Sequence, residues 1–162
     1  MYHSEAQRSG ALIVHACGYD SVPSDLGAML AAQAMQEHYT CDCASLTYVS
    51  RRTSGGASGG TIATALKVIF DGQDLPGTTE VKARGCYGLD PSTEIKENYG
   101  PDTADTIGFV EYNPVARTHV MPFIMAGANA PVVRKSNALL KYGGKNICTY
   151  QEVQAVDGWW SG

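Results

Sequence analysis

A polar turn that joins an apolar run to a helical pattern carries the residue types best suited to chemistry. The apolar run covers residues 11–16, and the turn at residues 17–25 reads Cys-Gly-Tyr-Asp-Ser-Val-Pro-Ser-Asp. Ligands of open α/β sheets bind at the carboxyl ends of strands, where such turns lie. Two interpretations follow. The turn is a capped helix start whose residues serve geometry alone, or it is one side of a substrate or cofactor crevice whose helix amides face an anion.

Three side chains in or beside this turn are candidates for proton transfer. Asp20 would orient a group or exchange a proton, and Tyr19 or His15 would donate one. With no partner in view, the simpler explanation of His15 is a hydrogen-bonded histidine on a buried strand. The sequence alone therefore names candidates here and leaves the general acid open.

A second candidate site is the glycine-rich segment 55–61, Gly-Gly-Ala-Ser-Gly-Gly-Thr. It is not a P-loop, because Thr61 stands where that motif requires lysine. Ser58 matches the G-x-S-x-G nucleophile elbow of hydrolases, with His119 as the one histidine downstream, but residues 51–55 separate it from the preceding strand. Alternatively, the segment binds a substrate carboxylate or phosphate at a helix start, or its glycines permit close packing. The residues of such an anion site would be Ser58, Gly59, Gly60 and Thr61.

The composition limits the classes of function. A net charge of −4 gives no basic surface for a nucleic-acid backbone, and the apolar run Ala11–Val14 is far shorter than a transmembrane helix. Five cysteines, an odd number at irregular spacing, indicate a reducing intracellular compartment without distinguishing cytoplasm, mitochondrion or a membrane-associated place. The scattered histidines predict no metal site. The basic pairs at 51–52 and 134–135 are expected on solvated faces, with a coenzyme A or acyl-carrier phosphate as the alternative partner.

Helical and strand patterns alternate along the chain. Helices are expected at residues 2–9, ending at Gly10, and at 25–36, 61–70 and 132–142. Strands are expected at 11–16, buried on both faces, and at 44–50 and 148–156, with 119–125 as a strand or buried loop and 73–115 mainly as loops. The alternation predicts the α/β or α+β class, with helices packed on a mixed sheet.

Three stretches, taken together, resemble one family. Residues 14–27, residues 58–64, and residues 122–126 continuing to 132–137 are similar to the saccharopine dehydrogenase-like oxidoreductases, the group that includes the trans-acting enoyl reductases. The resemblance spans roughly residues 2–150, and its first stretch is the most specific. It implies a two-domain protein. The chain would then be a single partial domain, residues 1–162. The end of a Rossmann-like half would lie at about 1–40, and a substrate or dimerisation α/β domain would begin at about 41 and run to 162.

The resemblance also implies NADP as cofactor, although the G-x-G-x-x-G fingerprint after a strand is absent here. The polar turn would line the nicotinamide and substrate crevice. The expected partners are the missing nucleotide-binding half or other protein subunits, in a homo-oligomer or a larger complex. The residues that the resemblance assigns to the cofactor crevice are Cys17, Gly18, Asp20, Ser21, Pro23 and Ser24.

The function that the resemblance implies is that of an NAD(P)-dependent oxidoreductase. The intact protein would reduce a double bond in a lipid-like substrate, and the fragment alone is expected to hold a dinucleotide weakly. A non-enzymatic alternative is a structural or interaction subunit that has lost its nucleotide-binding half. A third is a serine hydrolase that uses Ser58.

Overall fold

The computed structural model describes residues 2–51, 59–60, 62–63, 87–89, 109–144 and 148–156. Apart from residues 62 and 63, the predicted helix 61–70 lies outside these residues, as do most of the predicted loop region 73–115, Ser58 and Thr61. None of the described helices is long and apolar enough to cross a bilayer. The elements are α1 (His3–Ser9), α2 (Val22–Tyr39), β1 (Ser45–Ser50), β2 (Glu111–Asn113), β3 (Thr118–Pro122), α6 (Ala126–Leu140) and β4 (Thr149–Ala155).

The strands form one mixed sheet in the order β1-β4-β3-β2. β1 and β4 are parallel, with Ser45 opposite Thr149 and Tyr48 opposite Glu152. β3 runs antiparallel to β4, and β2 runs antiparallel to β3. The predicted α/β class with a mixed sheet is therefore confirmed. The edge strand β1 and its neighbour β4 are parallel because each follows a helix that returns the chain to the same end of the sheet.

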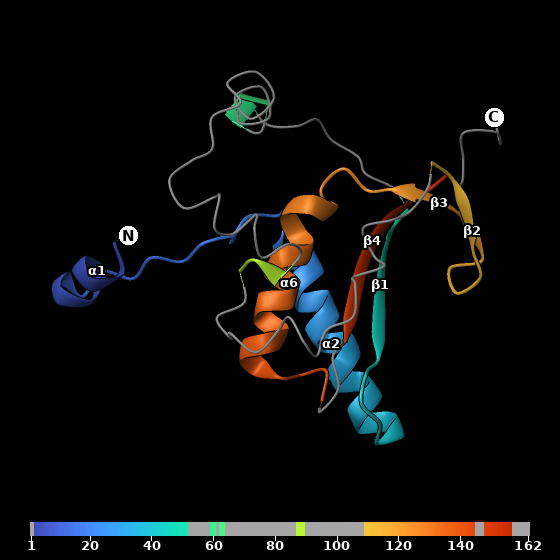
Figure 1. Cartoon of the computed structure of the whole chain (residues 1–162), viewed down its shortest axis with the longest axis horizontal. Helices are drawn as coiled ribbons and strands as arrows, with labels where there is room; N and C mark the ends of the chain where they lie inside the picture. Colours follow the sequence, from blue (N-terminus) through green and yellow to red (C-terminus); the bar gives the residue numbers. More distant parts are fainter. Residues whose placement is uncertain are drawn as a thin grey trace.

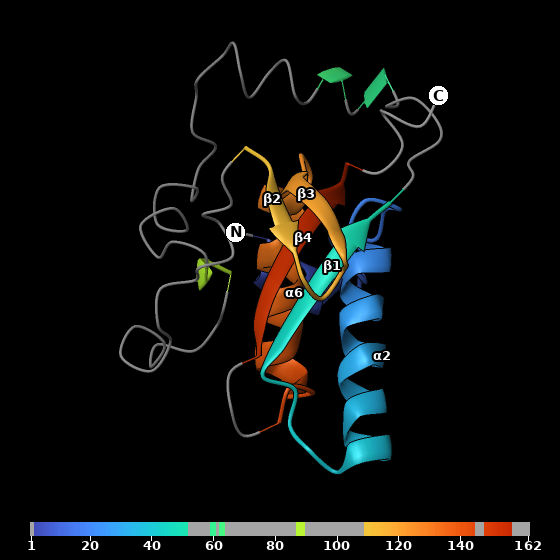
Figure 2. The same cartoon turned by 90° about the vertical axis from the view of Figure 1, so that its right-hand side faces the viewer.

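Helices α2 and α6 lie side by side over one face of the sheet (Figures 1 and 2). Small residues at the contact allow the helices and strands to approach closely, and Leu46 and Tyr48 from β1 and Tyr142, which follows α6, pack against them. The first turns of both helices therefore stand at the carboxyl ends of β1 and β4. The buried core comprises Ala28, Ala130, Val133 and Tyr150, with a second cluster of Ala32, Cys43 and Cys148.

Helix α2 begins three residues before its predicted start and ends at Tyr39. Pro23 occupies its first turn, where a missing N–H costs nothing, and Thr40 ends it in the left-handed conformation. The side of α2 that faces the sheet carries Ser24, Ala28 and Ala32. The leucines that recur at helical spacing lie on the other side and are about half exposed.

The structure contradicts the prediction of a buried strand at residues 11–16. These residues form no strand, and Leu12 is 96% exposed. Their composition favours a strand, but a strand needs hydrogen-bonding neighbours, and no described strand lies beside them. The predicted start of the helix at 132–142 was also wrong: α6 begins six residues earlier and contains Pro131. A proline this near the start of a helix removes one hydrogen bond without ending the helix.

The other predicted elements that fall on the described residues are confirmed. Helix α1 ends at Gly10, which adopts the left-handed conformation with φ of 71°. The strands expected at 44–50 and 148–156 are β1 and β4. The segment that was expected as a strand or a buried loop is β3, a strand. Local sequence patterns were therefore sufficient to predict a helix or strand wherever both the element and its neighbours belong to the described residues.

Candidate functional site

A buried polar cluster lies where the first turns of α2 and α6 meet the helix-covered face of β4. Asn129, on α6, is fully buried at its centre. The Ser21 hydroxyl donates to Asn129 Oδ1 at 3.0 Å, and Asn129 Nδ2 donates to Glu152 Oε2 at 3.1 Å. Asn129 Nδ2 also lies 3.5 Å from the Ser24 hydroxyl oxygen. One side chain thus joins α2, α6 and β4.

Glu152 projects from the middle of β4 into this cluster and is 3% exposed. The Tyr150 hydroxyl, two residues away on the same face of the strand, donates to Glu152 Oε1 at 2.6 Å. The two carboxylate oxygens therefore each accept a hydrogen bond from a neutral group, one phenol and one amide. Burial of a carboxylate is tolerated only with such partners, because leaving it without them costs several kcal/mol, roughly 3–5.

Two phenols beside Glu152 are held in their neutral, proton-donating form. Burial raises the pKa of Tyr150, and its hydrogen bond to Glu152 raises it further. Burial also raises the pKa of Tyr48, with smaller contributions from Glu152 and from Tyr19. Tyr48, on β1, is only partly buried, and the centre of its ring lies 6.2 Å from that of the Phe123 ring. Tyr48 is therefore the phenol of the cluster best placed to meet a ligand.

The polar turn that precedes α2 is closed by its own backbone. The carbonyl of Gly18 accepts the N–H groups of Ser21 at 3.3 Å and Val22 at 3.1 Å. Pro23 has no N–H, so Ser24 supplies the one remaining amide of the first helical turn. Ser21 stands at the N-cap position, but its hydroxyl bonds to Asn129 instead of capping the helix. A single amide is a weak cradle for a phosphate, which is usually held by several.

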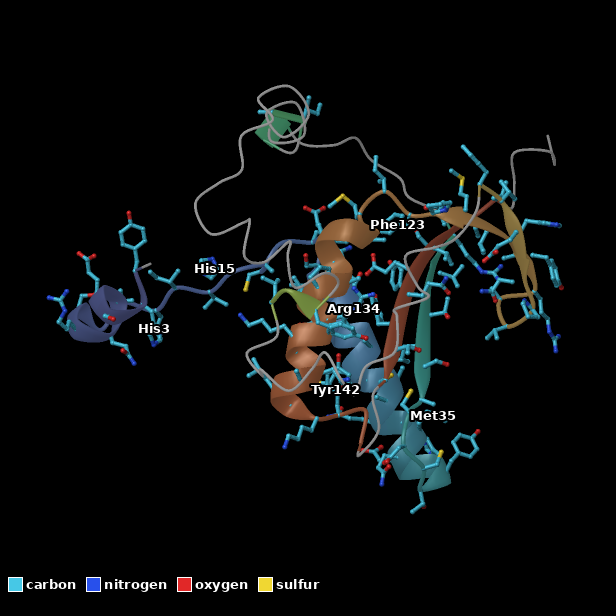
Figure 3. The ribbon with its side chains drawn as sticks, viewed as in Figure 1. His3, His15, Met35, Phe123, Arg134 and Tyr142 are labelled. Atoms are coloured by element: carbon cyan, nitrogen blue, oxygen red, sulfur yellow. The ribbon has the colours of Figure 1, made fainter. Side chains whose placement is uncertain are left out.

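The structure divides the sequence-predicted residues into two groups. Ser21 and Ser24 are buried in the polar cluster, and Tyr19 lies near enough to Tyr48 to influence its pKa. His15 lies on the N-terminal arm, residues 2–16, away from the cluster (Figure 3). The remaining turn residues are exposed, and within the described part of the chain their side chains form no hydrogen bond to Asn129 or Glu152; they are Cys17, Gly18, Asp20 and Pro23.

The glycine-rich segment is described only in part. Gly59 and Gly60 are helical and exposed, and a Cβ atom at Gly59 would meet nothing within 4 Å. Close packing therefore does not require glycine at position 59. His119, the histidine that a hydrolase would need, lies on β3 with its ring 5.4 Å from that of Tyr112. Ser58 itself is outside the described residues, so its pairing with His119 as a hydrolase site stays a prediction.

Sequence analysis missed three central residues of the cluster: Tyr48, Asn129 and Glu152. Glu152 carried a signal, since it is a charged residue within an otherwise strand-like run, which implies a specific partner. A fourth residue, Arg134, was expected on a solvated face and is instead buried, which corrects that expectation. Its Nη2 donates to the Tyr150 carbonyl at 3.2 Å, and its guanidinium lies 5.5 Å from the centre of the Tyr87 ring.

No protein-family profile matches the chain, and no solved structure matches it. Curated relatives do. A Mycobacterium tuberculosis protein with the provisional name of trans-acting enoyl reductase is 35% identical over 158 residues, which is 96% of this chain and 38% of the relative. Proteins named trans-acting enoyl reductase from Mycobacterium ulcerans and Mycobacterium leprae are 29% and 28% identical, over 96% and 99% of this chain. The chain spans about two fifths of each relative, and over nearly all of its own length it is similar to proteins named as enoyl reductases.

Proposed function

We propose that this chain is part of an enoyl reductase, an oxidoreductase that saturates the carbon–carbon double bond of a lipid-like acyl chain. The observation that carries the proposal is the 35% identity over 158 residues to the M. tuberculosis relative. The matched stretch includes the whole buried polar cluster. The resemblance to the saccharopine dehydrogenase-like oxidoreductases supports the same reaction class.

The polar cluster supports a role in the proton half of this reaction. Reducing an enoyl group adds a hydride to one carbon and a proton to its neighbour, where negative charge develops. Tyr48 is partly exposed and remains protonated, so its hydroxyl would supply that proton, and Tyr19 stands beside it. Asn129 and Glu152 would act through position, because both are buried and bonded to the start of α2 or to Tyr150.

We propose a nicotinamide dinucleotide as the hydride source, held by residues other than those described here. The described residues do not fit its pyrophosphate: the start of α2 offers the single amide of Ser24, and the sequence lacks G-x-G-x-x-G. Other polypeptide segments, on the same or another chain, would hold the nucleotide. The chain's own part is to position the acyl substrate and to supply a proton.

A hybrid protein tests this proposal. In the hybrid, this chain replaces the matched residues of the M. tuberculosis relative, and the assay follows NADPH consumption on addition of a trans-2-enoyl thioester. Tyr48→Phe is expected to lower kcat by about 100-fold or more, the usual contribution of a general acid. Tyr39→Phe is the matched control, since Tyr39 is 73% exposed at the far end of α2, and it should leave the rate unchanged.

Three outcomes count against the proposal. A folded hybrid without activity, in a host that is itself active, favours the non-catalytic subunit. Equal rates for Tyr48→Phe and the unsubstituted hybrid would remove Tyr48 from the proton step. Release of free acid from the thioester without NADPH consumption would instead indicate hydrolysis.

A further inference from the structure

Two buried thiols meet at the ends of β1 and β4 where the chain enters these strands. Cys43 is 4% exposed and Cys148 is 5% exposed, and both belong to the buried cluster that includes Ala32 of α2. Both are free cysteines, and a hydrogen bond joins their side chains. Neither belongs to the polar cluster around Asn129. The two thiols are therefore a pair of nucleophilic groups that the proposed function leaves unused.

The backbone of β1 and β4 holds the two cysteines side by side. The residue after Cys43 is Ala44, and its carbonyl accepts the N–H of Thr149, the residue after Cys148, at 3.0 Å. The parallel register continues with Ser45 opposite Thr149. Neighbouring strands lie about 4.8 Å apart, and a disulfide joins Cα atoms that are about 4.4–6.8 Å apart. A bond between the two sulfur atoms therefore requires no movement of the sheet.

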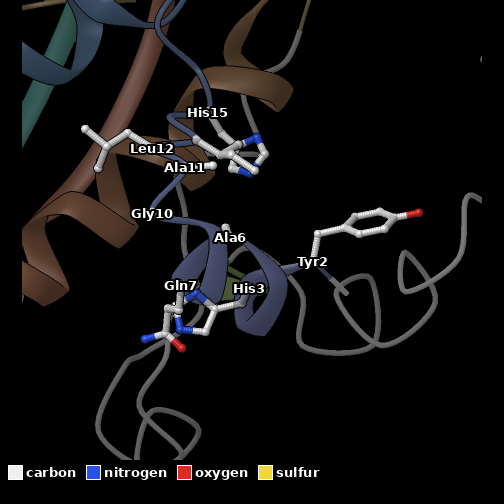
Figure 4. Close-up of a pocket in the computed structure, with 9 residues that line it drawn as sticks. Tyr2, His3, Ala6, Gln7, Gly10, Ala11, Leu12 and His15 are labelled. Carbon is white, nitrogen blue, oxygen red and sulfur yellow. The ribbon is translucent and has the colours of Figure 1, made fainter.

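Two cavities of the described residues give an oxidant no path to these thiols. A groove of about 740 Å³ lies between α1 and the segment that follows it, and no cysteine lines this groove (Figure 4). A cavity beside Cys148 measures about 10 Å³, which is room for one water molecule at most. Cys43, however, lies in residues 40–44, which belong to no helix or strand. Because such segments open at a lower free energy than the core, opening of residues 40–44 is the step that admits an oxidant.

The closed structure keeps both sulfur atoms unreactive. Burial raises the pKa of Cys148 to about 12, with smaller contributions from the neighbouring Cys43 thiol. The thiolate is the nucleophile in disulfide chemistry, and a thiol with so high a pKa is almost never ionised at neutral pH. The pair therefore stays reduced while residues 40–44 are closed, and it reacts when they open.

We propose that Cys43 and Cys148 are a modification site that closes to a disulfide by exchange with a small-molecule disulfide such as glutathione disulfide. When residues 40–44 open, the Cys43 thiolate attacks one sulfur of the oxidant and releases the first glutathione. Cys148 then attacks the Cys43 sulfur of the mixed disulfide and releases the second glutathione. The protein thiols give up two electrons and two protons, and these are recovered in two glutathione thiols.

The disulfide would secure the register of the two strands that carry the polar cluster. Tyr48 lies opposite Glu152, three positions along the same parallel pair. A covalent link at the start of the pair prevents these strands from sliding or separating. The link also closes a loop of roughly 100 residues, for which the loss of unfolded-chain entropy is large. We therefore expect the Tm of the oxidised chain to be higher by about 10 °C.

Exchange with glutathione in the isolated chain tests the inference. A chain with Cys17→Ser, Cys41→Ser and Cys86→Ser keeps only Cys43 and Cys148. It would be equilibrated with glutathione disulfide and a disulfide isomerase, and its free thiols would then be trapped by alkylation. Mass spectrometry should show a monomer lighter by two hydrogen atoms, with the two cysteines in linked peptides. Its Tm should be about 10 °C higher, and dithiothreitol should reverse the change. The same linkage, mapped in the original chain, is a second measurement.

Two control variants separate the pair from cysteines in general. Adding Cys43→Ala to the triple variant leaves one thiol at the site, so glutathione should form at most one mixed disulfide and the Tm should not rise. The matched control keeps the exposed Cys17 and Cys41 instead of the buried pair, by Cys43→Ala, Cys148→Ala and Cys86→Ser. It should form no bond within the chain.

The possible outcomes decide for or against the pair. Thiols at positions 43 and 148 that remain reduced after catalysed exchange overturn the inference. A disulfide between two chains, seen as a dimer on a non-reducing gel, also overturns it. A lower Tm after oxidation would show that the bond strains the sheet and would contradict the proposed fit. The assay uses neither NADPH nor an acyl substrate, so its result holds whether or not the hybrid reduces an enoyl group.

Discussion

Replacing Asn129 by aspartate probes the polar cluster with almost no change in side-chain volume. Asn129→Asp removes the amide donor that now reaches Glu152 Oε2 at 3.1 Å and puts a second carboxyl group against the first. Loss of a hydrogen bond to a charged group costs about 1.5–3 kcal/mol. With charge repulsion added, we expect the free energy of unfolding to fall by about 3 kcal/mol at pH 7.5. For a chain of this size, that corresponds to a fall of roughly 6–12 °C in Tm.

The pH dependence of this loss identifies its cause. Two carboxyl groups in contact raise the folded-state pKa of one of them above its unfolded value near 4. The repulsion is therefore absent below about pH 4 and grows as the pH rises from the unfolded pKa through the folded pKa. The difference in unfolding free energy between Asn129→Asp and the original chain should thus widen from pH 4.5 to pH 7.5.

Urea unfolding followed by circular dichroism at several pH values measures this difference. Gln33→Leu, a change at an exposed position of α2, is the control and should stay within about 0.5 kcal/mol of the original chain. A double-mutant cycle with Ser21→Ala should show coupling, because Ser21 donates to Asn129 Oδ1 at 3.0 Å. An Asn129→Asp variant as stable as the original at pH 7.5, or a loss that is the same at every pH, would refute the buried network.

Two further predictions concern stability. Gly144 has φ of +90°, and a Cβ atom there would overlap the Asp42 side chain, so Gly144→Ala should lower the Tm. Gly127 lies in α6 with open space around it, so Gly127→Ala should raise the Tm. A higher Tm for both would contradict the turn geometry. Burial, with the neighbouring Cys43 thiol, raises the pKa of Cys148 to about 12, so the folded state favours the neutral thiol. The contribution of the neutral Cys148 thiol to the free energy of unfolding is fully present below about pH 9 and is lost as the pH rises toward 12. The Tm of the original chain should therefore fall more steeply between pH 8.5 and 10.5 than that of Cys148→Ala, and equal slopes would contradict it.

The sequence predicted most elements of the described fold because their signals are local. The glycine at position 10 and the strand-like run at 148–156 each specify an element by residue type, and both are confirmed. The run at 11–16 has the same kind of signal, yet it forms no strand, because pairing depends on neighbours that the described residues do not include. A strand-like residue pattern thus did not suffice to form a strand.

The candidate site was predicted only where its residues are consecutive. Ser21 and Ser24 were found because they lie in one polar turn. Tyr48, Asn129 and Glu152 come from three elements that only the tertiary fold brings together, and no spacing in the sequence relates them. Their roles follow from burial and hydrogen bonding, which a single sequence does not contain.

The mass of the product formed by the hybrid tests the central claim most directly. The hybrid, the isolated chain and the intact M. tuberculosis relative would each be incubated with NADPH and a trans-2-enoyl thioester. We expect a saturated thioester, heavier by two hydrogen atoms, from the hybrid and the relative, and unchanged substrate from the isolated chain. The proposed function would be contradicted if a folded hybrid gave unchanged substrate or free acid while the relative was active. Saturated product from the isolated chain alone would also contradict it.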